Sequence, residues 1–250
     1  MKGINHMQKI FYDFHIHSCL SPCADNDMTP NNIVNMAKLK GLDVIAITDH
    51  NSCKNCEAVM LAGQKVGLAV LPGMELCTNE DVHVICLFSK LDGALQFSDI
   101  IYKKLPTIKN NAKIFGEQLI CDQNDNVTSK EEILLLNAAD ISVIDVMALV
   151  QKHEGMAFPA HIDKSANGII PILGGIPLEA GFKNVEVSDN FDKDAMFKQY
   201  KFINDYNTLK NSDAHYLWQI SEKNNCIKLP DIYDKNDTNS NILIINNLDW

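Results

Sequence analysis

Short apolar runs alternate with segments of helical spacing in the first third of the chain. The runs are residues 9–14, 43–48, 68–71 and 82–88, and their length and β-branched content predict buried strands. Two helices are predicted between the first three runs. One starts at Pro30 and stops at Gly41, and the next ends near Gly67. Strands that alternate with helices in this way predict parallel strands joined by crossover helices, and therefore an α/β fold.

The pattern weakens in residues 89–140, which we interpret as an insertion that either caps a pocket or decorates the fold, with decoration favoured. It resumes with a helix and three strands, at residues 141–152, 156–160, 185–187 and 208–210. The predicted domain spans residues 9–229. Residues 230–250 are interpreted as a polar linker and a C-terminal tail that ends in a strand or a docking segment.

Most of the histidines stand at or next to the ends of predicted strands. They are His15, His17, His50, His83, His161 and His215. A single histidine there is more often a core or surface residue, but the joint pattern favours a metal site, because barrels of parallel strands build active sites at the carboxyl ends of the strands. Imidazole and carboxylate ligands without thiolate are typical of zinc, manganese or iron. His6 and His153 fall outside the pattern and are interpreted as structural or surface residues.

Several short motifs occur in a fixed order. They are His15-Ile16-His17, Thr48-Asp49-His50, Gly73-Met74-Glu75, the lone His161, and Ser212-Asp213-Ala214-His215. Together they resemble the PHP (polymerase and histidinol phosphatase) superfamily, and the resemblance extends from Phe11 to His215. It implies a distorted (β/α)7 barrel, with two or three divalent metal ions (Mn, Fe or Zn) at the C-terminal mouth of its strands.

The resemblance also implies a set of ligands for each of three metals. One metal is assigned to His15, His17, Glu75 and Asp213, a second to Glu75, His83 and His161, and a third to Asp25, His50 and His215. Asp25 is placed by its spacing from Thr29-Pro30, with Asp27 as the competing choice. An aspartate at this position resembles the nucleotide-phosphatase branch of the superfamily, whereas the histidinol-phosphatase branch more often has histidine.

The implied activity is hydrolysis of a phosphate ester, in which a hydroxide that bridges two metals attacks phosphorus in line. Asp213 or His215 is expected to pass a proton to the leaving alcohol, with His50 a weaker candidate. All 22 basic residues are lysine, so no guanidinium fork is available for the distal phosphate. Lys164 and Lys54 lie on the expected loops and are candidates for that contact, although a solvated surface position is the commoner role for each.

Two cysteine pairs follow the first two histidine motifs. They are Cys19 with Cys23, and Cys53 with Cys56. Because their loops are expected to be neighbours, the four thiols could form a second metal site, either zinc or iron–sulfur, or a redox pair that regulates the metal centre. The favoured interpretation is that these small side chains pack in the protein and bind nothing.

The formal net charge of −10 bears on the partners of the chain. Because binding along a phosphate backbone depends on positive charge, we expect no extended nucleic-acid duplex as a partner. A small phosphorylated substrate stays compatible with this charge, since bound divalent metals reverse it locally. The sequence shows neither a signal peptide nor an apolar run that could span a bilayer. This predicts a cytoplasmic protein without a membrane partner, and leaves the oligomeric state open.

The expected function is therefore a metal-dependent phosphoesterase that acts on a small phosphorylated metabolite, with a nucleotide or an oligonucleotide end favoured. Two alternatives stay open. One is a phosphatase of the histidinol-phosphate type. The other is a non-catalytic module that binds metal or senses redox state, which the four cysteines Cys19, Cys23, Cys53 and Cys56 would support.

Overall fold

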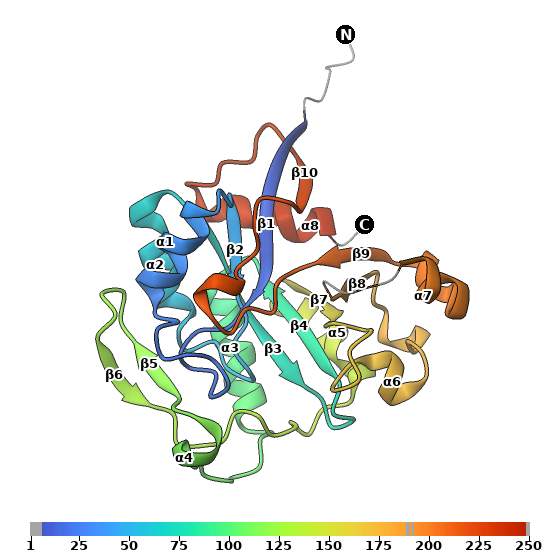
Figure 1. Cartoon of the computed structure of the whole chain (residues 1–250), viewed down its shortest axis with the longest axis horizontal. Coiled ribbons are helices and arrows are strands. Elements are labelled where there is room, and N and C mark those ends of the chain that lie inside the picture. The colour runs from blue at the N-terminus through green and yellow to red at the C-terminus, as the bar shows by residue number, and fades with distance from the viewer. Residues whose placement is uncertain (1–6, 189–190, 192, 249–250) are drawn as a thin grey trace.

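A six-stranded mixed sheet forms the wall of the molecule. The computed structural model describes residues 7–188, 191 and 193–248, so His6 lies outside the described residues. The strands follow the order β10-β1-β2-β3-β4-β7, and Figure 1 shows α1 and α2 on one side of them and α5 and α6 on the other. Their bounds are β1 Met7–Ile16, β2 Val44–Ile47, β3 Ala69–Cys77, β4 His83–Phe88, β7 Gly155–Pro159 and β10 Cys226–Pro230.

The fourth strand runs against its neighbours. β1, β2 and β3 are parallel as predicted, but β4 is antiparallel to both β3 and β7. The prediction of parallel strands is wrong here because a short turn joins β3 to β4, with Cys77 opposite His83, and such a turn is too short for a crossover helix. The first residue of β4 therefore lies at the same edge of the sheet as the last residues of β1, β2 and β3.

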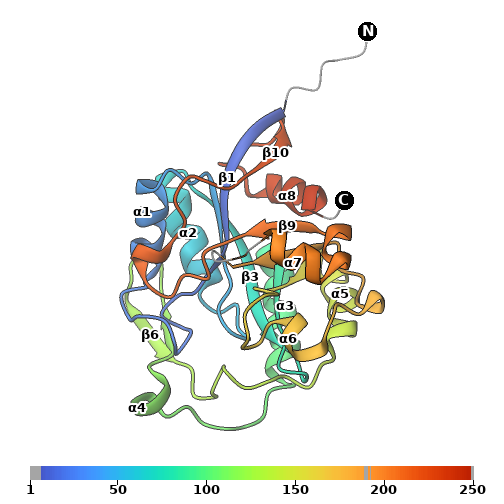
Figure 2. The same ribbon diagram turned by 45° about the vertical axis from the view of Figure 1, so that its right-hand side comes forward.

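A separate pair of parallel strands lies between β7 and β1. These are β8 Asn184–Val187 and β9 Asn207–Lys210, which Figure 1 labels, and Figure 2 shows β9 with α7 on the side that comes forward. On one flank, the Ile162 N–H donates to the Glu186 carbonyl at 2.9 Å. On the other, Ala214 forms a bridge with Ile16 and its carbonyl accepts from the His17 N–H at 2.9 Å. The wall is thus closed by a few bonds near the strand ends rather than by a continuous ladder.

Helices cover the outer face of the sheet. The longer ones are α1 Pro30–Leu39, α2 Cys56–Val66, α3 Leu91–Tyr102 and α5 Val143–Gln151, and the shorter ones are α4 Ala112–Phe115, α6 Ile169–Leu173 and α7 Lys193–Gln199. The 3-10 turns are η1 Leu178–Ala180, η2 Lys201–Asp205, η3 Leu217–Gln219 and η4 Thr238–Ser240. The predicted stop of α2 is observed, because Gly67 ends it in the left-handed conformation with φ +65°.

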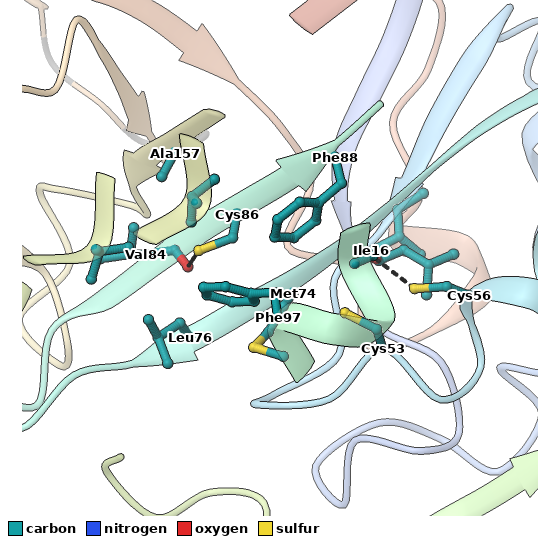
Figure 3. Close-up of a cluster of buried hydrophobic side chains, with 14 of the residues drawn as sticks. Ile16, Cys53, Cys56, Met74, Leu76, Val84, Cys86, Phe88, Phe97 and Ala157 are labelled. Atoms are coloured by element: carbon teal, nitrogen blue, oxygen red, sulfur yellow. Dashed lines mark hydrogen bonds between the residues drawn. The ribbon is translucent and has the colours of Figure 1, made fainter. Parts of the chain in front are cut away.

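The outer face of the sheet and its helices share one apolar cluster. Met74 of β3, Phe88 of β4 and Phe97 of α3 are fully buried in it. Figure 3 shows these side chains with the thiols of Cys53 and Cys56 among them. This packing fixes the helices, and the loops that precede them, against the strands.

The inner face of the sheet encloses a second apolar cluster, which α8 Asn241–Leu248 covers. Alternate residues of the strands belong to it, among them Phe14, Leu71 and Phe158, as the two-residue period of a strand requires. Ile244 and Ile245 of α8 are buried in the same cluster. The segment predicted as a linker and tail therefore docks against the inner face of the sheet as a helix and not as a strand.

The predicted insertion at residues 89–140 consists of two parts. Its first part is α3, an ordinary packing helix. The second contains α4 and the hairpin of β5 Leu119–Cys121 and β6 Val127–Lys130. The Leu119 N–H donates to the Cys19 carbonyl, the Ala139 N–H to the Cys77 carbonyl, and the Asn51 amide to the Leu135 carbonyl, each at 2.8 Å. The second part is therefore bound to the loops that follow β1, β2 and β3.

In the described part of the chain, the helices lack the length and apolar composition that crossing a bilayer requires.

Candidate metal centre

Four of the candidate ligands meet at the ends of β1 and β3 and in the loop after β9. The Nε2 atoms of His15 and His17 each lie 3.3 Å from an oxygen of Glu75. The same two nitrogens lie 3.2 and 3.3 Å from Oδ1 of Asp213. These four residues are the set assigned to one metal from the sequence, and their ligand atoms lie close enough together to hold one ion.

The Glu75 carboxylate is the centre of the cluster. Its Oε1 lies 2.9 Å from Nδ1 of His83 and 3.2 Å from Nε2 of His161, and its Oε2 lies 3.0 Å from Nδ1 of His50. Burial would raise the pKa of this carboxyl, but the imidazoles of His83, His15 and His50 hold the pKa well below its usual range. An anionic carboxylate with a separate set of imidazoles at each oxygen is suited to bridging two cations.

His83 reaches the cluster because β4 is antiparallel. Its side chain projects from the first residue of that strand, which lies beside the last residues of β3. His50 and His83 form a group with Glu75 that could hold an ion. His161 contacts the same Glu75 oxygen as His83 from the end of β7. Glu75, His83 and His161 were assigned to the second metal. The structure brings His50 to Glu75 and His83 as well.

A third group combines His17, His50 and His215. The rings of His17 and His215 are stacked with centroids 4.2 Å apart. Asp25, assigned to this group from the sequence, is exposed and is not part of it in the described structure. Its Oδ1 accepts from the Asp27 N–H at 2.8 Å, and its N–H donates to the His215 carbonyl. The loop thus lies against the cluster through its backbone, and a ligand role for Asp25 stays a prediction.

A buried carboxylate that the sequence analysis missed orients His15. Glu186 of β8 accepts from Nδ1 of His15 at 2.9 Å and from the Asn211 amide at 2.7 Å. Because a carboxylate only accepts, Nδ1 of His15 carries a proton, and in the neutral imidazole the lone pair is then on Nε2, which faces Glu75 and Asp213. The available signal was a single acidic residue within a short apolar run, Val185–Val187 in the sequence.

A hydroxyl fixes the tautomer of His17 in the same way. Ser21 Oγ donates to Asp49 at 2.7 Å and accepts the His50 N–H at 3.2 Å. Its only proton is therefore used, and its 2.9 Å contact with Nδ1 of His17 requires that nitrogen to donate. In the neutral imidazole of His17 the lone pair is therefore on Nε2, which faces the cluster.

Two residues of the cluster have strained backbones. His161 has φ +28° and Asp213 has φ +53°, a region that side-chain-bearing residues seldom occupy. The His161 N–H donates to Oε1 of Glu186 at 3.0 Å. Such strain persists only where surrounding contacts enforce it, and it is concentrated at functional sites.

The cluster contains buried polar atoms without hydrogen-bond partners. Among the described residues these include Nδ1 of His50, Oε2 of Glu75 and Nδ1 of His161. The His50 and Glu75 atoms lie 3.0 Å apart without sharing a hydrogen bond. Leaving such atoms unsatisfied costs about 1–3 kcal/mol each. A divalent cation ligated by both would satisfy them, so the residues fit the metal ions that the sequence predicts.

The two candidate lysines differ in where they lie. Nζ of Lys164 is 2.5 Å from Oδ2 of Asp213, at the rim of the cluster. Lys54 forms an ion pair with Glu131, and its Nζ lies 4.6 Å from the centre of the Tyr102 ring. The structure thus keeps Lys164 beside the candidate ligands and binds Lys54 to the segment that follows α3, so the proposed phosphate contact of Lys54 is not supported.

The four cysteines of the proposed second site do not come together. Cys53 and Cys56 are buried in the outer apolar cluster (Figure 3), with both thiols directed at the Gly73 carbonyl. Cys19 lies 3.6 Å from Cys121, measured between the sulfurs, and Cys23 is exposed. Within the described residues these thiols form no metal-binding group. The interpretation of packing cysteines fits Cys53 and Cys56 best, since burial raises the pKa of the Cys53 thiol well above its usual value.

Solved structures share this fold. A lesion-specific endonuclease Q from Pyrococcus furiosus superposes with a TM-score of 0.63 at 18% identity, over 84% of this chain and 49% of that one. A putative metal-dependent phosphoesterase from Bifidobacterium adolescentis gives a TM-score of 0.56 at 17% identity, over 82% of this chain and 87% of that one.

A second structure of endonuclease Q, with a TM-score of 0.62 and 17% identity, holds a 27-mer duplex substrate with an abasic lesion at the active site. The expectation that an extended duplex is excluded is therefore wrong for this fold. It was drawn from net charge, which is a sum over the whole chain and does not describe the local field at a metal-binding mouth.

Curated relatives match over shorter stretches. A 5'-3' exoribonuclease of Haemophilus influenzae is 30% identical over 79 residues, which is 30% of this chain and 28% of that protein. An uncharacterized protein of Methanocaldococcus jannaschii is 34% identical over 88 residues, which is 32% of this chain and 51% of that protein. The chain thus aligns with about half or less of either relative.

The family model of the PHP domain matches residues 13–166. The match contains the ends of β1 to β4 and β7, from which His17, His50, Glu75, His83 and His161 project. This chain belongs to the PHP domain family.

Proposed function

We propose that the chain is a metal-dependent phosphoesterase that hydrolyses a nucleotide or the end of an oligonucleotide. The observation that carries the proposal is the Glu75 carboxylate, whose two oxygens face separate sets of imidazoles. Overlapping groups of ligands of this kind are suited to two or three cations. Manganese, iron and zinc are metals that accept this set of donors. The relatives named as an exoribonuclease and an endonuclease support a substrate that contains a nucleotide.

The arrangement assigns a task to each residue. Divalent metals held by His15, His17, His50, Glu75, His83, His161, Asp213 and His215 would activate water and polarise the phosphoryl group. In the neutral imidazoles of His15 and His17, the bonds to Glu186 and Ser21 place the proton on Nδ1 and leave Nε2, which faces the cluster, as the nitrogen that can bind a cation. The cluster would lie at the mouth of one distorted barrel of seven strands, made by β1, β2, β3, β4, β7, β8 and β9.

Proton transfer to the leaving alcohol is assigned to Asp213 or His215. Their side chains are 16% and 23% exposed, whereas His50 is nearly buried, so the first two are accessible to a substrate that enters from solvent. The ammonium of Lys164, beside Asp213, is placed to contact a phosphoryl oxygen, as a point charge rather than a fork.

Release of inorganic phosphate from the monoesters, and of nucleotides from the oligonucleotides, by protein purified without oxygen and loaded with manganese tests the proposal. The substrates are nucleoside monophosphates, 3′,5′-bisphosphates, short oligonucleotides and histidinol phosphate. We expect turnover of a nucleotide substrate that is lost in His161→Ala and retained in His153→Ala, because His153 lies outside the cluster. Preferred turnover of histidinol phosphate would contradict the substrate class. If protein with bound metal hydrolysed none of these esters, the result would contradict catalysis.

A further inference from the structure

An exposed aromatic pair follows directly after two of the candidate ligands. Tyr216 and Trp218 are 43% and 71% exposed, and their rings are stacked with centroids 6.0 Å apart and planes inclined by 23°. Asp213 and His215 immediately precede them in the chain. A tryptophan with an open ring face buries apolar area only when a partner, best a flat one, stacks on it.

Hydrogen bonds join the segment that carries the pair to the candidate ligand His215 and to the end of α1. Oε1 of Gln219 accepts from the His215 N–H at 2.8 Å and from the Tyr216 N–H at 3.1 Å. Nζ of Lys40, at the end of α1, donates to the Trp218 carbonyl at 2.9 Å. Consecutive Cα atoms are about 3.8 Å apart, so Trp218 lies within about 12 Å of His215, which is within the reach of one or two nucleotides.

A hollow of about 460 Å³ adjoins Trp218. Its other walls include Lys210, Ser212, Asn224 and Asn225. Ser212 comes directly before Asp213, and its hydroxyl donates to the His15 carbonyl at 3.2 Å, so the hollow extends to the segment that bears the candidate ligands. An aromatic wall beside amide and hydroxyl groups provides both stacking and edge contacts for a nucleobase, and the volume is that of a small-molecule site.

We propose that Trp218, backed by Tyr216, and the adjoining hollow form the subsite for a nucleobase of the substrate. The inference rests on the proposed phosphoesterase function, since it places the base while the phosphate lies at the metal centre. Stacking is tolerant of sequence, because every base has a π-face. The subsite therefore raises affinity for nucleotide substrates as a class and selects only weakly among the bases.

Kinetics with and without a base test the subsite. Trp218→Ala should raise KM for a nucleoside monophosphate about tenfold or more, because base stacking on an aromatic ring typically contributes this much. Trp218→Phe should restore most of the loss. Neither change should alter KM for ribose 5-phosphate. The control is Leu178→Ala, at a residue that is 85% exposed on η1, which should leave KM for both substrates unchanged. Equal KM changes for both substrates, or no change for either, would overturn the subsite.

A binding measurement separates this inference from the proposed function. The chain has 2 tryptophans, so a Trp250→Phe protein reports Trp218 alone. Adenosine, which has no phosphate to release, should quench its fluorescence in a saturable way, and ribose should not. Quenching by adenosine in a protein that hydrolyses no phosphate ester would support the base site while the phosphoesterase proposal fails. The absence of quenching in an active enzyme would overturn the base site alone.

Discussion

Residues outside the candidate ligand set determine which nitrogens of the histidines in the candidate metal centre carry protons. Glu186 and Ser21 each hold one nitrogen of an imidazole, and in doing so decide which nitrogen can bind a cation. Glu186 has the wider role, since it also accepts the N–H of His161, a residue with a strained backbone, and the amide of Asn211. One buried carboxylate thus orients ligands on β1 and at the end of β7.

Glu186→Gln should weaken metal binding about tenfold or more, the usual effect of losing such an outer partner. The amide keeps the shape of the side chain but loses the charge that favours a donating Nδ1 on His15. Manganese titration by calorimetry measures the change. Glu154→Gln, at an exposed residue paired with Lys90, is the matched control and should leave the affinity unaltered. Equal affinities for the two variants would refute the orienting role.

At the scale of single elements, the start of α5 shows a cap supplied from outside the helix. Ser142 occupies the N-cap position, but its hydroxyl makes no cap bond to the helix. It donates instead to Oε1 of Glu80 at 2.5 Å, and the Val143 N–H donates to the same carboxylate at 3.0 Å. Glu80, in the turn between β3 and β4, therefore satisfies the helix end and places a negative charge at its positive pole.

Glu80→Gln should lower the free energy of unfolding by about 1 kcal/mol at neutral pH, the usual size of an N-cap contribution. Slight burial would raise the pKa of Glu80, but the bonds from Ser142 and Val143 lower it below the ordinary value of 4.5. A lowered pKa means that the contribution is present above pH 4.5 and is lost as the pH falls through the folded-state value. Urea unfolding of both proteins should show this difference shrinking in acid, whereas a constant difference would contradict the charge effect. Glu132→Gln, in an exposed ion pair, is the control.

The positions of seven strands could be predicted from the sequence, but the strands β5, β6 and β10 and the direction of β4 could not. An apolar run has the same hydrophobic pattern in either direction, and only the short turn after Cys77 shows that the chain reverses. The run at residues 242–245 was ambiguous for a similar reason, since short apolar stretches suit a strand or a buried helix equally. The motif residues could be predicted because each motif is a short contiguous run that contains metal-binding residue types. Glu186 was not, because its partners come from β1, β7 and the loop after β9.

Helix α8 closes the inner cluster, and its two faces give a matched test of that role. Ile244 is fully buried, whereas Ile242 is 36% exposed on the same helix. Ile244→Ala should lower the free energy of unfolding by about 2–4 kcal/mol, from lost transfer energy and a residual cavity. Ile242→Ala should lower it by well under half of that amount. Similar losses for the two variants in urea unfolding would show that α8 does not seal the core.

At the scale of the whole molecule, the candidate metal centre lies where the wall is least continuous. The β8–β9 pair shares no ladder with the main sheet. It is attached near the ends of β1 and β7 by a few backbone bonds, two between Ala214 and the end of β1 and one between Ile162 and Glu186. The bonds of Glu186 and Asn211 to His15 and Phe14 add to this attachment. Asp213, the candidate ligand after β9, faces His15 and His17 of β1. Cations bound there would join the two edges of the wall.

If the cluster holds metal as proposed, removing it should therefore loosen one side of the wall before the rest. Hydrogen exchange of protein treated with a chelator should quicken in residues 184–187 and 207–215, relative to the manganese-loaded form, because local opening there breaks few backbone bonds. Exchange in β2 and β3 should change little, since a continuous parallel ladder joins them. Glu186→Gln should reproduce part of the effect even with metal present. Uniform quickening across all strands would show instead that the metals stabilise the fold as a single cooperative unit.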